Sequence, residues 1–149
     1  MAADKLAITF FYSLEKAIKT YRQFAQNNIN RAGIDITIDQ WLVLKTLQDN
    51  PDVTLQQVSK DVFKDFASIT RIIQLLETKG YVARLVHPED GRRSAFSLTR
   101  VGRETVRSLQ PIIARNRSRA VRGIRKSDIE NAHAVLAIIS ANCQATSQP

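Results

Sequence analysis

DFASITRIIQLLETKGYVARLVHPEDGRRSAFSLT, residues 65–99, is the stretch that decides the fold. It begins with a helical segment, 66–79, that has one apolar face and one small, polar face. Two short strand-like runs follow Gly80, and a turn rich in charged side chains joins them. A helix that can enter a groove, followed by a basic hairpin, predicts a winged helix-turn-helix that touches DNA. We expect the rest of the chain to position this unit.

The segment 66–79 divides its residues between two faces. Apolar side chains recur at the spacings that bury one face of a helix, namely at Ile69, Ile72, Ile73 and Leu76. The opposite face offers hydroxyl, guanidinium and amide groups, and we predict DNA contacts from Ser68, Thr70, Arg71 and Gln74. Arginine matches guanine O6 and N7, and glutamine matches adenine N6 and N7. Leu75 lies on the flank, where it could pack inward or touch a thymine methyl group.

The strand-like runs 81–87 and 95–98 predict a hairpin, because an Asp-Gly turn signal lies between them. Arg92 and Arg93 follow this signal, and we predict both as DNA contacts, since the negative potential of a narrow minor groove attracts arginine. Asp90 is expected to brace Arg92 at the tip of this wing. The brace would orient the arginine rather than stabilise the fold, because exposed ion pairs contribute under about 1 kcal/mol. The alternative is a surface hairpin with incidental charge.

The net charge of +8 is concentrated in one part of the 149-residue chain. Residues 1–59 carry 6 basic and 6 acidic side chains, residues 60–126 carry 16 and 6, and residues 127–149 carry none and 2. This asymmetry favours a polyanionic partner such as nucleic acid, although a basic face kept for solubility is the alternative. The basic run 115–126 could follow phosphates, meet acidic groups of a partner or simply be solvated, and sequence does not choose among these.

Several classes of function lack their sequence signals. No Gly-rich phosphate loop and no nucleophile motif is present, so we expect no enzyme and no cofactor. His87 and His133 lack spaced cysteine or carboxylate partners, which argues against a metal site. Cys143 is the single cysteine and fits a reducing cytosol. No apolar run approaches the ~20 residues of a membrane span, and no secretory signal is evident, so a cytoplasmic protein of one domain is expected.

Two long helical segments flank the central unit, at 4–32 and 100–145. Apolar residues in 4–32 form two adjacent stripes, more width than one small neighbour would cover. We expect both segments to build a two-fold dimer interface, and the alternative for 4–32 is the core helix of a monomer. Pro111 should bend or split the second segment.

Capping signals predict where the other helices begin. Thr37, Thr54 and Ser127 each precede a Gln or Glu by three residues, the pattern of a capping box. Asp65 is expected to accept a hydrogen bond from the backbone amide three residues later, and Thr99 to cap the helix after the hairpin. Trp41 is expected in the core.

Three motifs together resemble the MarR family of transcriptional regulators: ITIDQWLVLKTL at 36–47, SITRIIQLLETKGYV at 68–82 and DGRRSAFSLTRVGRE at 90–104. The resemblance covers roughly residues 5–145. It implies a mainly α fold with a small β-hairpin wing, a winged helix-turn-helix at 36–99, and helical dimerisation regions at 4–32 and 100–145 within one domain, 1–149.

The resemblance also implies a function. Such a protein binds duplex DNA as a homodimer on a pseudo-palindromic operator, often as a repressor, and releases it on binding a small aromatic or phenolic effector. The chain departs from the family at Phe66 and Ala67, where Pro and Ser are frequent, and at Leu75, where arginine is common. The alternative is a winged-helix module that binds protein or RNA without operator specificity; a large exposed aromatic on the reading helix would favour it.

Overall fold

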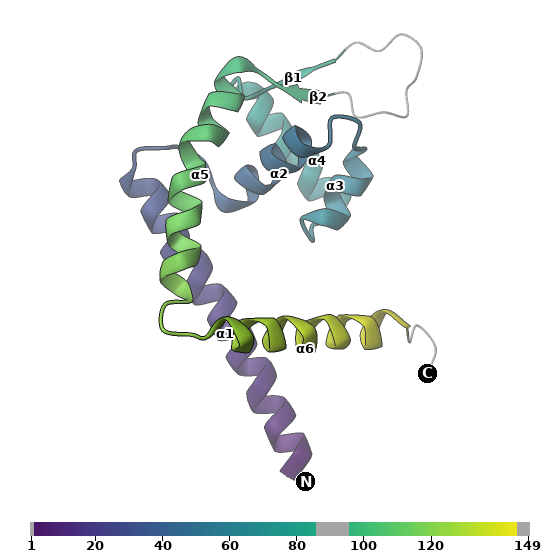
Figure 1. Ribbon diagram of the computed structural model, residues 1–149. Coiled ribbons are helices and arrows are strands. Elements are labelled where there is room, and N and C mark those ends of the chain that lie inside the picture. The colour runs from purple at the N-terminus through teal and green to yellow at the C-terminus, as the bar shows by residue number, and fades with distance from the viewer. Residues whose placement is uncertain (1, 86–95, 146–149) are drawn as a thin grey trace. The chain divides into compact units, whose positions relative to one another are not determined.

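The computed structural model describes residues 2–85 and 96–145, and the order of its elements is shown in Figure 1. The elements are α1 (Ala2–Arg31), α2 (Ile38–Asp49), α3 (Leu55–Asp61), α4 (Phe66–Thr78), β1 (Val82–Arg84), β2 (Phe96–Leu98), α5 (Arg100–Ala120) and α6 (Lys126–Ala145). The expectation of a mainly α fold with a small hairpin is confirmed. None of these helices is long and apolar enough to span a membrane, within the residues described.

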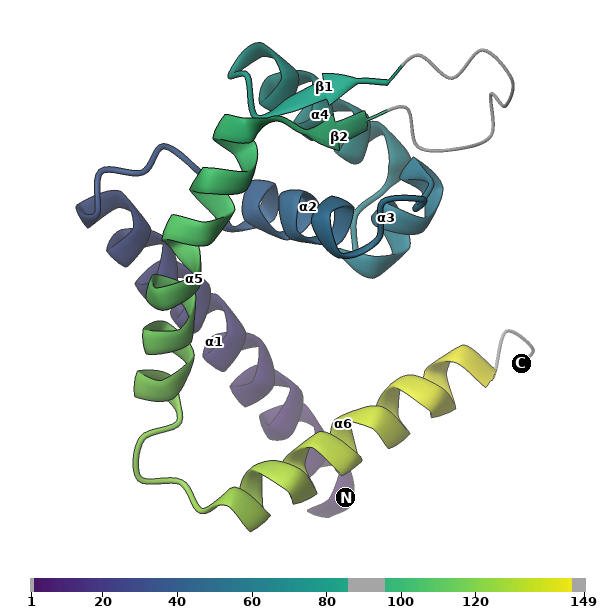
Figure 2. The same ribbon diagram turned by 45° about the horizontal axis from the view of Figure 1, so that its top comes forward.

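The chain divides into two compact units, residues 1–116 and 117–149. In the first unit α2, α3 and α4 group beside the β1–β2 hairpin, as Figures 1 and 2 both show. α4 contacts α2, α3 and β1, and α2 in turn contacts α1, α3 and β2. Its predicted inward residues Ile69, Ile73 and Leu76 are fully buried, and Ile72 is half-buried. Trp41 is also in this core, as predicted.

Local capping signals set the start of α2 and α3. The Thr37 hydroxyl accepts from the Gln40 amide at 3.1 Å, and the Gln40 side chain accepts from the Thr37 amide at 3.0 Å, so the predicted capping box is formed. At Thr54 only half of the predicted box is formed: the hydroxyl accepts from the Gln57 amide at 3.1 Å, but the Gln57 side chain donates to Asp61 at 3.1 Å. These contacts replace hydrogen bonds that the first turn of a helix cannot make internally.

The hairpin pairs antiparallel, with Val82 opposite Leu98 and Arg84 opposite Phe96. Val82, Phe96 and Leu98 are buried, so one face of the hairpin belongs to the core. The predicted tip, with Asp90, Arg92 and Arg93, lies outside the described residues.

Thr99 joins the hairpin to α5. Its hydroxyl donates to the Gly80 carbonyl at 2.6 Å and accepts from the Gly102 amide at 3.0 Å, as predicted for a cap. Its own amide donates to the Tyr81 carbonyl at 3.0 Å. Gly102 packs against the same carbonyl so closely that a Cβ there would lie 2.1 Å from the Tyr81 oxygen. Only a residue without a side chain fits this position unless the backbone moves.

α5 continues through Pro111 as one helix, so of the two predicted effects, a bend or a split, the split does not occur. Proline removes one backbone hydrogen bond, but the neighbouring Leu109, Ile112 and Ile113 are buried and hold both sides of it against the core.

The second unit contains α6, and the prediction that Ser127 caps it is wrong. The helix begins at Lys126, and the Arg125 carbonyl accepts from the amides of Asp128 and Ile129. The Asp128 carboxylate instead accepts two hydrogen bonds from the Arg125 guanidinium, at 2.9 and 3.2 Å. This bidentate pair, with its acid in the first turn, starts the helix earlier than the hydroxyl would.

Candidate nucleic-acid interface

The first turn of α4 is held by Asp65. Its carboxylate accepts from the Ser68 amide at 2.7 Å, as predicted, and from the Ser68 hydroxyl at 3.0 Å. The backbone amide of Ser68, followed by its hydroxyl, lowers the pKa of Asp65 below its ordinary value. Asp65 is therefore ionised at neutral pH. The Ser68 hydroxyl donates to a neighbour within the protein, which leaves its oxygen lone pairs for another partner.

The exposed face of α4 carries the other predicted contacts. Arg71 and Gln74 are exposed, and Thr70 is half-buried with its hydroxyl donating to the Phe66 carbonyl at 2.9 Å. Ser68, Thr70, Arg71 and Gln74 thus share one helix, and the two with the longest side chains point away from the core. The arrangement supplies donors and acceptors suited to base edges.

Large apolar side chains are exposed on and before the same helix. Leu75 is 48% exposed, which decides the sequence alternatives in favour of an outward position. Phe66 is exposed in the first turn. Phe63 is 93% exposed and has a φ of 59°, a left-handed conformation that is unfavourable for a residue with a side chain. No sequence signal marks this strain, because the link between α3 and α4 contains no glycine.

The base of the wing is described, although its tip is not. The Arg84 guanidinium carbon lies 5.0 Å from the centre of the Phe96 ring, and Arg84 Nε lies 3.9 Å from Glu77 Oε2. A cation over an aromatic ring is held electrostatically. The DNA contacts of Arg92 and Arg93 and the Asp90–Arg92 brace stay predictions, since these residues fall outside the described part.

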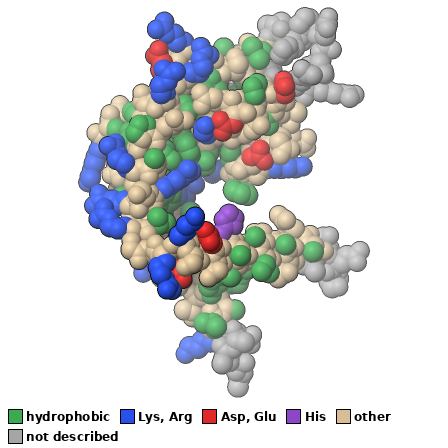
Figure 3. All heavy atoms as spheres, in the orientation of Figure 1, with side chains coloured by type: hydrophobic (Ala, Val, Ile, Leu, Met, Phe, Trp, Pro, Cys, Tyr) green, Lys and Arg blue, Asp and Glu red, His purple; other side chains and the backbone are tan. Residues whose placement is uncertain are grey.

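The distribution of charge shows which parts of the surface suit an anionic partner such as DNA. Figure 3 shows Lys and Arg side chains widely distributed over the visible face, with fewer Asp and Glu. A cavity of about 400 Å³ at the α2–α3 link is acidic instead, lined by Asp49, Asp52 and Asp61 among others. This hollow would repel phosphates. In the described ranges no group of three His, Cys, Asp or Glu residues could hold a metal ion.

Two residues near α4 were not recognised from sequence as part of the site. Lys64 directly precedes the Asp65 cap, and its ammonium group lies 3.1 Å from the carboxylate of Asp39 on α2. Their separation by 25 positions follows no helical or strand spacing. The sequence offered only a weak signal for this contact, namely a lysine placed immediately before a helix cap.

A helix-turn-helix that exposes Arg71 and Gln74 and leads into a two-stranded hairpin defines a winged helix-turn-helix fold. Residues 36–94 match the model described as the MarR family. This match confirms the resemblance to that family noted in the sequence.

Individual proteins are similar over most of the chain. The HTH-type transcriptional repressor IacR of Pseudomonas putida is 23% identical over 134 residues, which cover 90% of this chain and 79% of IacR. The Staphylococcus aureus MepR–DNA complex matches with a TM-score of 0.79 and 20% identity, covering 90% of this chain and 96% of MepR. Bordetella bronchiseptica BpsR, whose DNA binding is regulated by 6-hydroxynicotinic acid, matches with a TM-score of 0.77 and 23% identity over 89% and 98%. The structural matches confirm the fold.

Proposed function

We propose that this chain is a sequence-specific, duplex-DNA-binding transcriptional regulator that acts as a homodimer on a pseudo-palindromic operator. The observation that carries the proposal is the exposed face of α4, where Arg71 and Gln74 extend from a helix whose opposite face buries Ile69, Ile73 and Leu76. A rigid helix that presents such side chains is the unit that reads base edges in the major groove.

The proposed contacts divide by role. Arg71 and Gln74 read bases, Ser68 and Thr70 contact the backbone or nearby base edges at the helix start, and Arg92 and Arg93 of the wing enter the adjacent minor groove. Leu75 is a candidate for contact with a thymine methyl group because it is exposed beside Arg71 on α4.

Dimerisation is supported by apolar side chains that the single chain leaves exposed. In α1, Leu6, Ile8 and Phe11 are each more than half exposed. In α6, no residue is buried by the described chain, and Val135 and Ile138 are exposed. Exposed apolar faces of this extent mark interaction surfaces. A two-fold dimer would present two reading helices to half-sites about 10 bp apart.

We further propose that the regulator is a repressor released by a small aromatic effector. The support is by similarity: IacR is named a repressor, and DNA binding by BpsR is regulated by 6-hydroxynicotinic acid. 6-Hydroxynicotinic acid is a small hydroxylated aromatic compound, which agrees with the small aromatic or phenolic effector expected from the sequence.

A second candidate is a winged-helix module that binds protein or RNA. The exposure of Phe63 and Phe66 favours it, because aromatic rings at a recognition helix stack on unpaired bases or enter protein pockets. We rank it second, since no aromatic residue lies on the Arg71–Gln74 face.

The test begins with selection of a binding duplex from a random library by the full-length protein. The selected duplex and a scrambled duplex are then titrated at two salt concentrations. The log of the affinity should fall by about 0.9 per log of salt for each phosphate neutralised. Equal affinity for both duplexes would contradict the proposal, and tighter binding to single-stranded RNA would support the second candidate.

Single substitutions separate base reading from charge. Arg71→Ala should cost about 1–3 kcal/mol on the selected duplex and relax base preference at one position of the site. Arg93→Ala should weaken all duplexes alike. Arg107→Ala, which removes the same charge from the exposed surface of α5, is the control. If the selected-to-scrambled ratio fell equally for Arg71→Ala and Arg107→Ala, the assignment of Arg71 would be wrong.

A further inference from the structure

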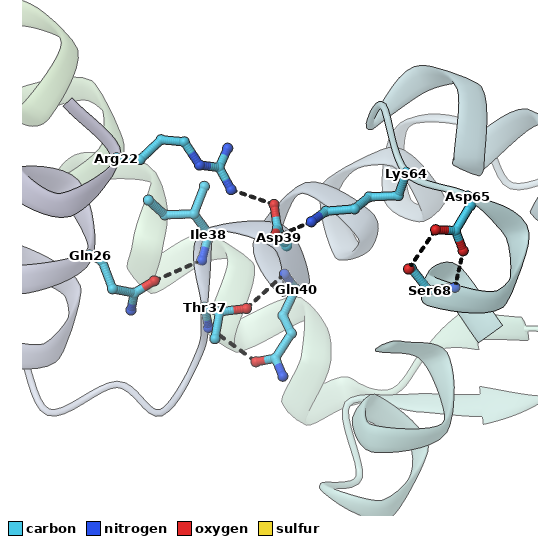
Figure 4. Close-up of polar contacts among 9 residues, drawn as sticks. All are labelled: Arg22, Gln26, Thr37, Ile38, Asp39, Gln40, Lys64, Asp65 and Ser68. Atoms are coloured by element: carbon cyan, nitrogen blue, oxygen red, sulfur yellow. Dashed lines mark hydrogen bonds and ion pairs between the residues drawn. The ribbon is translucent and has the colours of Figure 1, made fainter. Parts of the chain in front are cut away.

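Three elements meet at the carboxylate of Asp39 in the first turn of α2, as Figure 4 shows. Arg22 of α1 places Nη2 2.5 Å from Asp39 Oδ1. Lys64, in the turn between α3 and α4, places Nζ 3.1 Å from Asp39 Oδ2. Each carboxylate oxygen therefore has its own cation, and the two cations are 42 positions apart in the chain.

The α1 side of this junction is held by more than the ion pair. The Gln26 side chain accepts from the Ile38 amide and donates to the Ile36 carbonyl, both at 3.0 Å. These two bonds tie α1 to the backbone on both sides of the Thr37 cap, and Figure 4 draws the one to the Ile38 amide. The capping box at Thr37 then fixes the direction of the first turn of α2. Asp39 is consequently held in place relative to α1 by the backbone as well as by charge.

The Lys64 side of the junction leads directly to α4, the helix proposed to read base edges and called the reading helix below. The Lys64 amide donates to the Ser59 carbonyl at 2.9 Å, and the next residue is the cap Asp65. The link from α1 through Asp39 therefore reaches Lys64, the residue directly before the N-cap of α4. A change in the position of Lys64 would move the N-terminal turn of α4, where Ser68 is located.

The three side chains are partly shielded from water, with exposed fractions of 27% for Asp39, 40% for Arg22 and 37% for Lys64. Burial alone would raise the pKa of Asp39, but the hydrogen bonds from Arg22 and Lys64 outweigh it and lower the pKa below its ordinary value. The carboxylate is therefore charged at neutral pH. Because two charged donors share it, loss of either alters the geometry of the other.

We propose that Asp39 is a positioning residue for DNA binding, because it holds the turn before the reading helix to α1 and so sets the orientation of α4. The inference rests on the proposed function. Asp39 opposes binding by charge, since it is an acid that neutralises the lysine nearest the start of α4. A positioning role predicts that geometry outweighs this electrostatic cost.

Because charge and geometry act in opposite directions, the direction in which Asp39→Asn changes DNA affinity distinguishes the two explanations. Asp39→Asn keeps the shape of the side chain and raises the net charge by one, so general electrostatics predicts tighter binding to every duplex. Positioning predicts that affinity for the selected duplex falls roughly tenfold while affinity for the scrambled duplex holds or rises. Asp49→Asn is the matched control, because Asp49 lies on the same helix and pairs with Lys45 at 2.9 Å, outside the junction. It should leave the selected-to-scrambled ratio unchanged.

A second pair of variants tests the α1 side, where no DNA contact is proposed. Arg22→Met should lower the selected-to-scrambled ratio, and Arg22→Lys should restore it in large part because the ion pair to Asp39 is kept. Far-ultraviolet circular dichroism at the assay temperature identifies any unfolded variant. If Asp39→Asn unfolded, the comparison of the two Arg22 variants would decide the question.

The inference is overturned if Asp39→Asn and Asp49→Asn give the same ratio, or if the two Arg22 variants do. A wild-type protein that binds both duplexes equally would overturn the proposed function instead, which keeps the two failures distinct. Full-length protein is used throughout.

Discussion

Replacing Gly102 by alanine tests the packing between the hairpin and α5. Gly102 lies in the first turn of α5, and an added Cβ would be 2.1 Å from the Tyr81 oxygen and 3.0 Å from the Tyr81 carbonyl carbon. The Tyr81 backbone cannot easily move away. Its oxygen accepts from the Thr99 amide at 3.0 Å, and the Tyr81 amide donates to the Leu76 carbonyl at 2.9 Å.

Two effects of Gly102→Ala have opposite signs. In an ordinary helix the change would stabilise the protein by about 1 kcal/mol, because alanine loses less backbone entropy. Here the backbones must separate by roughly 1 Å, and overpacking of this kind costs about 1–3 kcal/mol. Weakening the Thr99–Tyr81 hydrogen bond adds about 1 kcal/mol. We therefore expect a net loss of about 1–3 kcal/mol in the free energy of unfolding.

Urea unfolding followed by circular dichroism, at fixed protein concentration, measures this loss. Ser108→Ala, at an exposed position of the same helix, is the control and should change the free energy of unfolding by less than about 0.5 kcal/mol. A Gly102→Ala protein more stable than the wild type by about 1 kcal/mol would show that helix propensity alone governs the site. The close approach of α5 to Tyr81 would then be refuted.

Four other outcomes are expected. Ile73→Ala should lower the free energy of unfolding by about 2–5 kcal/mol in urea, because it leaves a cavity beneath α4; a loss below about 1 kcal/mol would contradict the burial. Phe63→Gly should raise the thermal midpoint by relieving a left-handed strain of about 1 kcal/mol, and a lowered midpoint would show that the exposed ring packs on something. Since the pKa of Asp39 is lowered, its contribution to stability is present above pH about 3.8 and is lost as the pH falls through the folded-state value; Asp39→Asn should flatten the stability profile in that window, and an unchanged acid limb would contradict the pairing. Phe11→Lys should convert a dimer to a monomer in sedimentation velocity, and an unaltered dimer would exclude that face of α1 from the interface.

Local signals were sufficient to predict much of the fold. Thr37, Asp65 and Thr99 cap helices as expected because each cap depends on residues within three positions of itself. The inward stripe of α4 followed from helical spacing for the same reason. Two capping boxes differed from the prediction. At Thr54 the Gln57 side chain bonds to Asp61 instead of the cap, and at α6 Ser127 had the pattern of a cap but the Arg125–Asp128 pair began the helix earlier. Two competing local signals cannot be ranked without their geometry.

The candidate site was less accessible to sequence reasoning. The outward direction of Arg71 and Gln74 was predicted from a turn of about 100° per residue, and the exposure of Leu75 required the structure because a flanking position can face either way. The junction at Asp39 could not be predicted. It joins residues whose separation reflects the packing of α1 and the α3–α4 turn on α2, and no periodic pattern encodes such packing.

The reading helix is attached at both of its ends, and this has a mechanical consequence. Its start is tied through Lys64 and Asp39 to α1. Its end runs into Gly80, whose carbonyl is bonded to the Thr99 hydroxyl at the beginning of α5. α4 is thus attached to α1 at its start and to the beginning of α5 at its end. A small sliding of α1 against α5 would tilt α4 rather than displace it. The angle at which α4 meets a groove would then depend on the offset between α1 and the first turns of α5.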